Sequence, residues 1–317
     1  MRTTIGDVGD EDVAIVVHDL VMDYGGLRAV DGLGFQVRRG EIYALLGPNG
    51  AGKTTTVEIL EGHRRRTDGV VSVLGEDPWR AGRRFRDRVG IVLQSGGVDP
   101  ELTVAELVRL YAGFYGHPRS VADTVEQVGL TSKWGSRIRT LSGGQLRRLD
   151  LALAMVGDPD VIFLDEPTTG FDPNARHAAW DMIDGFRATG TTVLLTSHYL
   201  DEVQHLADRV GVMSRGRLIA ESTPGELGGR DRAQTTISFR LGARGPLPPG
   251  PWATPERDGD LVTLLTDEPV YALRDLTEWA VREGVDLVGL TVTRPSLEDV
   301  YLQLTNDDNP TNIGVEP

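Results

Sequence analysis

The sequence predicts an α/β fold followed by a smaller α+β domain. Over the first two-thirds of the chain, short apolar runs alternate with segments of helical periodicity, a pattern typical of a parallel sheet covered by helices. Residues 222–234, rich in glycine, proline and charge, interrupt this alternation and predict a linker. A chain of 317 residues is also long enough for two hydrophobic cores, so we expect two domains.

The elements can be placed in order. In the first domain, strands are expected at residues 13–24, 32–47, 69–77, 88–94, 161–167 and 191–198. Helical segments are expected directly after residue 54, then from 101 to 155, and between and after the last two strands. In the second domain we expect strands at 235–241, 261–266 and 285–293, with helices at 269–284 and 296–305.

These elements define the expected boundaries. The first domain spans residues 13–228 and contains a helical subdomain at about 95–157, and the second spans residues 235–306. Residues 1–12 form an expected flexible acidic tail, and residues 307–317 a second flexible tail.

Composition excludes several classes of function. There are 47 acidic against 33 basic residues, a net charge of −14, which disfavours binding to nucleic acid. Because the chain has no cysteine, it can form neither disulfides nor zinc–thiolate sites. The acidic start lacks the pattern of a secretory signal, and the apolar runs are too short to span a bilayer, so we expect a cytoplasmic protein.

The segment GPNGAGKT, residues 47–54, has the spacing of a phosphate-binding loop between an apolar run and a helix. Backbone N–H groups of such a loop, with the positive end of the helix dipole, surround phosphate oxygens. Lys53 would reach the β- and γ-phosphates, Thr54 would ligate Mg²⁺, and Thr55 would contact a phosphate. The full set of expected contacts is Gly47, Pro48, Asn49, Gly50, Ala51, Gly52, Lys53, Thr54 and Thr55.

The segment VIFLDEP, residues 161–167, places an acidic pair at the end of a buried strand. In a parallel sheet this edge is where ligands bind. Asp165 would hold Mg²⁺, and Glu166 would polarise the attacking water. A pair of acids that merely caps the next helix is the alternative interpretation.

The segment LSGGQ, residues 141–145, narrows the prediction. With it the chain carries six motifs in a fixed order: the phosphate loop, Gln94 in IVLQ, LSGGQ, FLDEP, Asp172 in GFDP and His198 in LLTSH. This series resembles the ATP-binding cassette (ABC) family and covers about two-thirds of the chain. The resemblance implies a P-loop NTPase fold of the ABC type that binds ATP with Mg²⁺ and hydrolyses ATP.

The resemblance also implies roles for single residues. Gln94 would contact Mg²⁺ and water, His198 would contact the γ-phosphate, and Asp172 would lie at a dimer seam. Tyr24 matches the aromatic residue that stacks on adenine, although a tyrosine packed on the surface at a strand end is the alternative. The family more often has leucine where this chain has Phe171.

In this family the signature turn of one domain closes on the γ-phosphate held by another. Because the chain has one phosphate loop and one signature, the resemblance implies a head-to-tail homodimer. The signature residues expected to contact nucleotide are Ser142, Gly143, Gly144 and Gln145.

The residues around these motifs and the C-terminal stretch RPSLEDVYLQLT indicate the type of cassette protein. They resemble those of daunorubicin-resistance-type exporter ATPases. Such proteins pair with a separate permease of the ABC-2 class, which would hold this chain at the inner face of the membrane. The implied cargo is a hydrophobic compound: a drug, a lipid or an envelope precursor. The alternative is a regulatory ATPase that remodels a soluble partner.

Two locally basic segments, residues 63–69 and 80–90, stand out in this acidic chain. We first interpret them as a solvated face with internal ion pairs. Contact with anionic lipid headgroups or with a membrane partner is the second interpretation.

Overall fold

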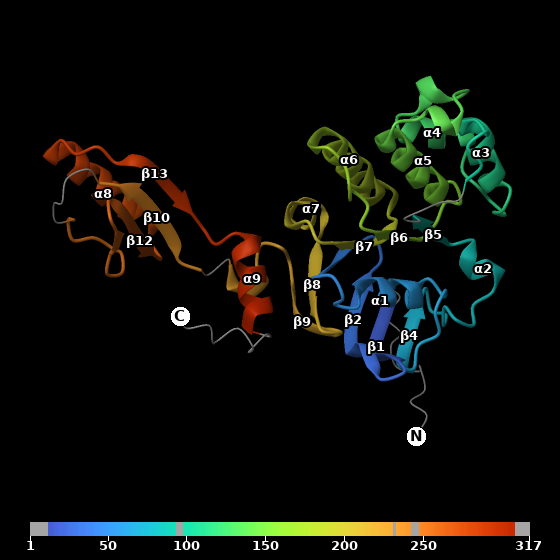
Figure 1. Ribbon diagram of the computed structural model, residues 1–317, viewed down its shortest axis with the longest axis horizontal. Helices are drawn as coiled ribbons and strands as arrows, with labels where there is room; N and C mark the ends of the chain where they lie inside the picture. The colour runs from blue at the N-terminus through green and yellow to red at the C-terminus, as the bar shows by residue number, and fades with distance from the viewer. Residues whose placement is uncertain (1–11, 93–97, 231–232, 242–246, 308–317) are drawn as a thin grey trace. The chain divides into compact units, whose positions relative to one another are not determined.

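The computed structural model describes residues 12–92, 98–230, 233–241 and 247–307 (Figure 1). The chain divides into two compact units between Pro224 and Gly225.

The first unit contains an antiparallel sheet of order β2-β1-β4. Its strands are β1 (Val13–Tyr24), β2 (Leu27–Arg38) and β4 (Asp68–Val73). Strand β2 begins several residues before the expected start, because the turn Gly25–Gly26 pairs its first residues directly with the end of β1. Both glycines have positive φ, 63° and 111°, which suits a residue without a Cβ atom.

The second sheet of this unit has the order β5-β6-β7-β3-β8-β9. Strands β3 (Ile42–Leu46), β5 (Val89–Val92), β6 (Val161–Asp165), β7 (Thr192–Ser197) and β8 (Arg209–Ser214) run parallel, while β9 (Arg217–Ser222) is antiparallel to β8. Strands β3 and β7 are buried along their whole length, as an apolar run in a covered parallel sheet requires.

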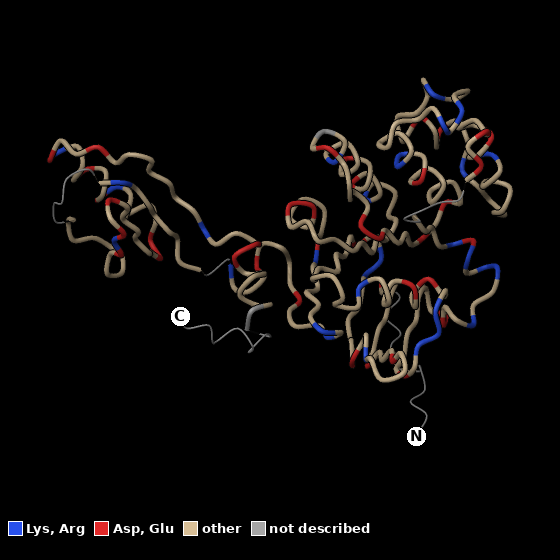
Figure 2. Tube along the Cα trace, in the orientation of Figure 1, with Lys and Arg blue, Asp and Glu red and all other residues tan. Residues whose placement is uncertain are grey.

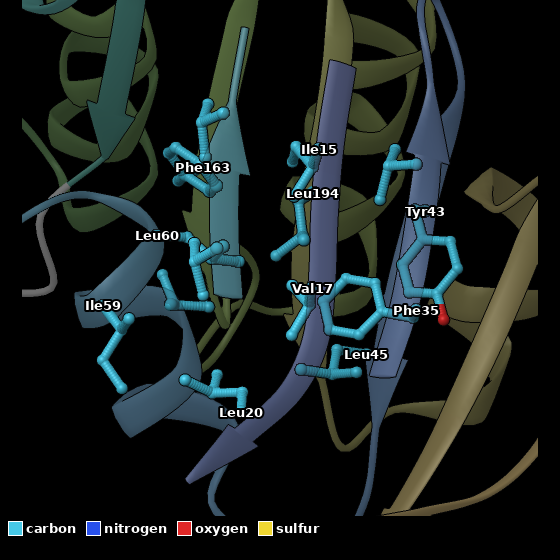
Figure 3. Close-up of a cluster of buried hydrophobic side chains, with 14 of the residues drawn as sticks. Ile15, Val17, Leu20, Phe35, Tyr43, Leu45, Ile59, Leu60, Phe163 and Leu194 are labelled. Carbon is cyan, nitrogen blue, oxygen red and sulfur yellow. The ribbon is translucent and has the colours of Figure 1, made fainter. Parts of the chain in front are cut away.

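The hydrophobic core lies between these two sheets. Figure 3 shows Phe163 and Leu194 of the parallel sheet facing Ile15 and Val17 of β1, with Ile59 nearby. Phe35 and Tyr43 stack across the layers, with ring centres 5.2 Å apart. This packing fixes the parallel sheet against the antiparallel one and so positions the strand ends that carry the site.

The helices of the first unit are α1 (Lys53–Leu60), α2 (Arg83–Arg86), α3 (Val104–Ala112), α4 (Val121–Gln127), α5 (Gly143–Met155), α6 (Pro173–Thr189) and α7 (Leu200–Leu206). Helices α3, α4 and α5 pack on one another as a small helical group (Figure 1). Helix α3 begins at a capping box in which Thr103 and Glu106 exchange hydrogen bonds. Short 3-10 turns, η1 (Thr131–Lys133) and η2 (Ile138–Thr140), lead from α4 to α5.

The second unit is a four-stranded antiparallel sheet with one helix on its face. Its strands β10 (Thr235–Arg240), β11 (Glu256–Asp258), β12 (Leu261–Thr266) and β13 (Val288–Thr293) have the order β11-β12-β10-β13. Helix α8 (Pro269–Glu283) packs Leu276 and Trp279 against Ile237 and Phe239. Helix α9 (Leu297–Asp307) packs on the turn η3 (Leu227–Gly229). Within the described ranges, no helix of either unit has the length and apolar character needed to cross a membrane.

Candidate active site

The site is built at the carboxyl edge of the parallel sheet. Strands β3, β6 and β7 pair so that Leu46 lies opposite Ser197 and Asp165 opposite Thr196. The three strands therefore end together, and the segments that follow them carry the phosphate loop, the acidic pair and His198. This is the edge at which parallel α/β sheets bind ligands.

The phosphate loop follows β3 and has a fixed shape. A Cβ atom on Gly47 would lie 2.5 Å from the Met213 carbonyl oxygen, and one on Gly52 would lie 2.4 Å from that of Ala29. Gly52 also has a φ of 100°, which disfavours any other residue. The loop closes through a hydrogen bond from Ala51 N to the Pro48 carbonyl oxygen, 3.2 Å. Glycine is therefore required by sterics at both ends of the loop.

Lys53 is held inside this loop. Its Nζ atom donates to the carbonyl oxygens of Gly47 (2.6 Å) and Pro48 (3.1 Å), and only 6% of the residue is exposed. Burial lowers the pKa of Lys53, and the negative charges of Glu166 and Asp165 oppose this shift. The ammonium group thus belongs to the same electrostatic cluster as the acidic pair.

The acidic pair is oriented by one buried hydroxyl that the sequence analysis did not identify. Thr196 Oγ1 donates to Asp165 Oδ1 at 2.5 Å and accepts from Glu166 N at 3.1 Å. Thr196 is fully buried in β7. Glu166 adopts a φ of 48°, a left-handed conformation that is costly for a residue with a side chain. The hydroxyl that directly follows the apolar run of residues 193–195 near the end of the strand was the signal that could have located Thr196.

Glu166 and His198 meet directly. Glu166 Oε1 lies 3.3 Å from His198 Nδ1, and Thr169 Oγ1 donates to Glu166 Oε2 at 3.1 Å. The two side chains are 23% and 36% exposed, so both remain accessible to water. A carboxylate held between a hydroxyl and an imidazole in this way can orient and polarise a water molecule.

Two neighbouring side chains, those of Thr54 and Asp165, could hold a divalent cation. Thr54 Oγ1 lies 3.4 Å from Asp165 Oδ2, which places a hydroxyl beside a carboxylate. Among the described residues, no cluster of three or more acidic or histidine side chains forms a metal cage. One hydroxyl and one carboxylate fit Mg²⁺, which typically takes few protein ligands and completes its shell with phosphate oxygens and water. Gln94, the third expected ligand, lies outside the described residues.

The signature turn opens helix α5. Ser142 is its N-cap, and Ser142 and Gln145 form a capping box with N–O distances of 3.1 and 3.3 Å. Gly143 and Gly144 provide the first N–H groups of the helix, and both Ser142 and Gly143 are exposed. The polar turn is therefore a preformed helix N-terminus that faces away from the core.

A hollow of about 810 Å³ adjoins this turn. Its lining combines the signature turn with Glu166 and residues 169–172, and it includes no residue of the phosphate loop. Asp172 borders it and caps helix α6 by accepting from Ala175 N at 2.9 Å. The structure thus places Glu166 beside the signature turn of the same chain, while the phosphate loop is not part of that hollow.

Arg147 joins the signature helix to the acidic loop, a link that sequence analysis missed. Its Nε donates to the Pro167 carbonyl oxygen (3.0 Å), and Nη2 approaches that of Asp165 (3.4 Å). Burial lowers the pKa of Arg147, and nearby carboxylates, Asp150 first, oppose the shift. Movement of helix α5 would therefore be transmitted to the backbone beside Glu166.

Tyr24 ends β1 and is 40% exposed, as an aromatic that stacks on a ligand must be. The Arg64 guanidinium lies over its ring, 5.2 Å from the ring centre. One face of Tyr24 is thus engaged in a cation–π contact.

Comparison with known proteins identifies the family. The ABC transporter family profile matches residues 30–169, and the profile for the C-terminal domain of ABC-transporter-domain-containing proteins matches residues 235–296. Over 307 residues the chain is 38% identical to the daunorubicin resistance ATP-binding protein DrrA3 of Streptomyces coeruleorubidus, covering 94% of this chain and 97% of that protein. This chain belongs to the ABC transporter ATP-binding proteins. It therefore binds ATP and is an ATPase of the kind that drives transport.

Two further similarities extend this result. The chain is 37% identical over 302 residues to the Nod factor export ATP-binding protein I of Ralstonia nicotianae, covering 91% of this chain and 92% of that protein. A solved ATP-binding cassette, a dimer in a post-hydrolysis state bound to ADP and Pi, matches with a TM-score of 0.59 and 21% identity, covering 66% of this chain and 98% of that one. This structural match confirms the P-loop cassette fold predicted for the first domain.

Glu61 generates a testable pH dependence. This carboxyl follows α1, has 9% of its side chain exposed, and has a pKa raised to about 8, first by burial and then by the charges of Asp165 and Glu58. The folded state therefore holds a proton that the unfolded state releases, so stability falls as the pH rises from about 4.5 to about 8.

Replacing the Glu61 carboxyl should remove this pH dependence of the stability. We predict that Glu61→Gln is more stable than the wild type above pH 8, by up to about 1.4 kcal/mol for each unit by which the folded pKa is raised. The difference should shrink toward acidic pH. Denaturant unfolding across this pH range measures it, with Glu126→Gln as the control for loss of an exposed carboxyl. A difference that stays constant with pH would contradict the assignment.

Proposed function

We propose that this ABC ATPase is the motor of an exporter, that it acts as a head-to-tail homodimer, and that it drives a separate permease of the ABC-2 class. The relatives named for daunorubicin resistance and for Nod factor export support the export role. Because these two relatives are named for different compounds at similar identity to this chain, we assign the choice of cargo to the permease. The cargo class we propose is a hydrophobic compound.

The observation that carries the dimer proposal is the division of the site. The phosphate loop lies at the sheet edge with Asp165, while the signature turn faces a hollow without any phosphate-loop residue. The capping box uses the N–H groups of Ser142 and Gln145, so those of Gly143 and Gly144 would bind an anion, and the lining of this hollow holds no phosphate-loop residue. A second copy, rotated by two-fold symmetry, would bring its phosphate loop there. The dimeric state of the similar solved cassette supports this arrangement.

The proposed chemistry follows from the residues present. Lys53 and the loop N–H groups bind the phosphates, Ser142 of the second copy closes on the γ-phosphate, and Tyr24 stacks on adenine. Glu166, held by Thr169 and His198, orients the attacking water. Thr54 and Asp165, with Gln94, would hold Mg²⁺, which when bound offsets the negative charge that develops on the phosphates. No covalent enzyme intermediate is needed, because positioning and electrostatics account for the catalysis.

A second hollow, of about 380 Å³, is the proposed seat of the permease. It lies where the turn after α1 meets helices α3 and α5, and its lining includes Phe85, Ile91, Tyr111, Tyr115 and Leu153. Apolar and aromatic side chains of this kind suit the apolar face of a short helix. Binding there would place this ATPase at the inner face of the membrane.

Mixed variants test the division of the site. Lys53→Ala disables the phosphate loop, and Ser142→Arg blocks the signature turn. In a head-to-tail dimer of the two, one composite site carries both defects and the other is intact. We predict that an equimolar mixture of the two inactive chains recovers about a quarter of wild-type ATP hydrolysis, because half of the dimers are mixed and each has one intact site.

The control mixes Lys53→Ala with the double variant Lys53→Ala/Ser142→Arg, which leaves no intact site in any pairing. Its rate should stay at background. Equal rates in the two mixtures would show that each chain hydrolyses ATP with its own signature turn, and the dimer proposal would fail.

Hydrolysis with the permease tests the motor role. We predict that the permease encoded beside this chain, reconstituted in lipid, changes the ATPase rate of the wild type, and that Glu166→Gln lowers that rate by at least about a hundredfold. ATP binding should survive in Glu166→Gln, as measured by nucleotide titration. A wild-type rate that ignores the permease would argue against transport, and co-purification with a soluble partner would favour the regulatory alternative.

A further inference from the structure

A basic surface stands out on a protein that is acidic as a whole. Residues 63–88 contain eight arginines and four acidic residues, whereas the whole chain has a net charge of −14. Nothing in the proposed ATP chemistry uses most of these arginines. The structure shows where they lie and which of them have partners.

The two basic segments lie side by side. Arg66 forms two hydrogen bonds of 3.0 Å to Asp77, and a Cβ atom on Gly62 would lie 2.5 Å from the Pro78 carbonyl oxygen. The turn after α1 is therefore in contact with the loop before α2. In Figure 2, blue Lys and Arg segments recur along this side of the unit, around α2 and beside β4. The exposed members, which we call the arginine rim, are Arg65, Arg80, Arg83, Arg84 and Arg86.

The rim arginines are poorly neutralised. Three neighbours have close carboxylates: Arg64 with Glu58 (2.5 Å), Arg66 with Asp77 (3.0 Å) and Arg88 with Asp160 (2.6 Å). In the rim itself, only Arg80 approaches a carboxylate, at 3.9 Å, and that carboxylate is the one already bound by Arg66. Among the described residues, no other rim arginine has an ion pair. We first interpreted the basic segments as internally paired. This interpretation holds for Arg64, Arg66 and Arg88 and not for the arginine rim.

Exposed apolar side chains accompany the rim. Trp79, next to Arg80, is 48% exposed, and Phe114, which follows helix α3, is 60% exposed. Arg83 Nη2 donates to the Phe114 carbonyl oxygen at 3.4 Å, so this aromatic lies beside the rim. Guanidinium groups together with exposed aromatics match the chemistry of the membrane–water interface, where tryptophan resides and arginine pairs with phosphate.

We propose that the arginine rim binds the headgroups of anionic lipids. A planar guanidinium can bind a phosphodiester through two hydrogen bonds, and the contributions of several such groups on one surface add. Of this surface, only Arg86 and Trp79 line the hollow assigned to the permease, so a helix seated there would leave the other four arginines and Phe114 to contact lipid. Lipid contact would hold that hollow toward the membrane. Only this orientation of the hollow toward the membrane rests on the proposed function. Lipid binding itself can be measured without a permease.

Vesicle flotation with the purified full chain tests the inference. We expect the wild type to float with vesicles of phosphatidylcholine and phosphatidylglycerol, not with phosphatidylcholine alone, and to be released at high salt. A protein of net charge −14 is otherwise repelled by an anionic surface, so retention reports a local site. The triple variant Arg65→Gln/Arg80→Gln/Arg84→Gln should bind about a hundredfold more weakly, at about fivefold per arginine.

The matched control removes three exposed arginines of the second unit, as Arg240→Gln/Arg274→Gln/Arg282→Gln, and should bind like the wild type. Replacing the same three rim positions with lysine should retain most of the binding and shows that the sites tolerate substitution. Basal ATP hydrolysis should be unchanged in all variants.

Three results would overturn the inference: equal flotation with neutral and anionic vesicles, equal loss in the rim and control variants, or no flotation of the wild type. If the rim variant instead loses stimulation by the permease in neutral lipid, the rim contacts the permease and not lipid. If the chain binds anionic vesicles but the permease does not change its ATP hydrolysis, the proposed function fails and this inference stands. If the permease changes ATP hydrolysis but the chain does not bind the vesicles, this inference fails and the proposed function stands.

Discussion

The parallel register of β3, β6 and β7 is the constraint on which the site depends. Because the three strands end together, the loops that follow them bring Lys53, the acidic pair and His198 to one edge. Thr196 then links two of these strands through hydrogen bonds to Asp165 and Glu166. The core between the two sheets fixes the strands in turn, so packing away from this edge sets the geometry of Lys53, the acidic pair and His198.

The same unit carries two further surfaces, the first of which shares Glu166 with this edge. The signature turn, a helix N-terminus, lines a hollow without phosphate-loop residues, and the second hollow lies where the turn after α1 meets the helical group. Arg147 connects the signature helix to the loop that carries Glu166. In the proposed dimer, closure of a second copy on the signature turn would reach Glu166 through Arg147, whose side chain is 12% exposed. This link is a physical route by which the proposed dimer would act on Glu166.

Much of this arrangement could be predicted from the sequence. Apolar runs such as residues 161–165 and 192–197 form buried parallel strands, and the spacing of GPNGAGKT places Lys53 inside its loop. The hairpin of β8 and β9 was not predicted, because its turn, Arg215–Gly216, lacks the Asn-Gly or Asp-Gly signal although both residues have positive φ. Thr196 and Arg147 were missed because their roles depend on contacts across the fold. The short strand β11, charged at every position, carries no apolar signal.

The central claim is that the γ-phosphate site is shared between two copies of this chain. The absence of native cysteine allows a direct measurement by disulfide trapping. Chains with Asn49→Cys and Glu166→Gln are mixed with chains with Ser142→Cys and Glu166→Gln, each with a different tag. Our account predicts a cross-link between the two tagged chains that forms with ATP and not with ADP. A cross-link that forms equally without nucleotide, or no cross-link between the two tagged chains in the presence of ATP, would contradict it.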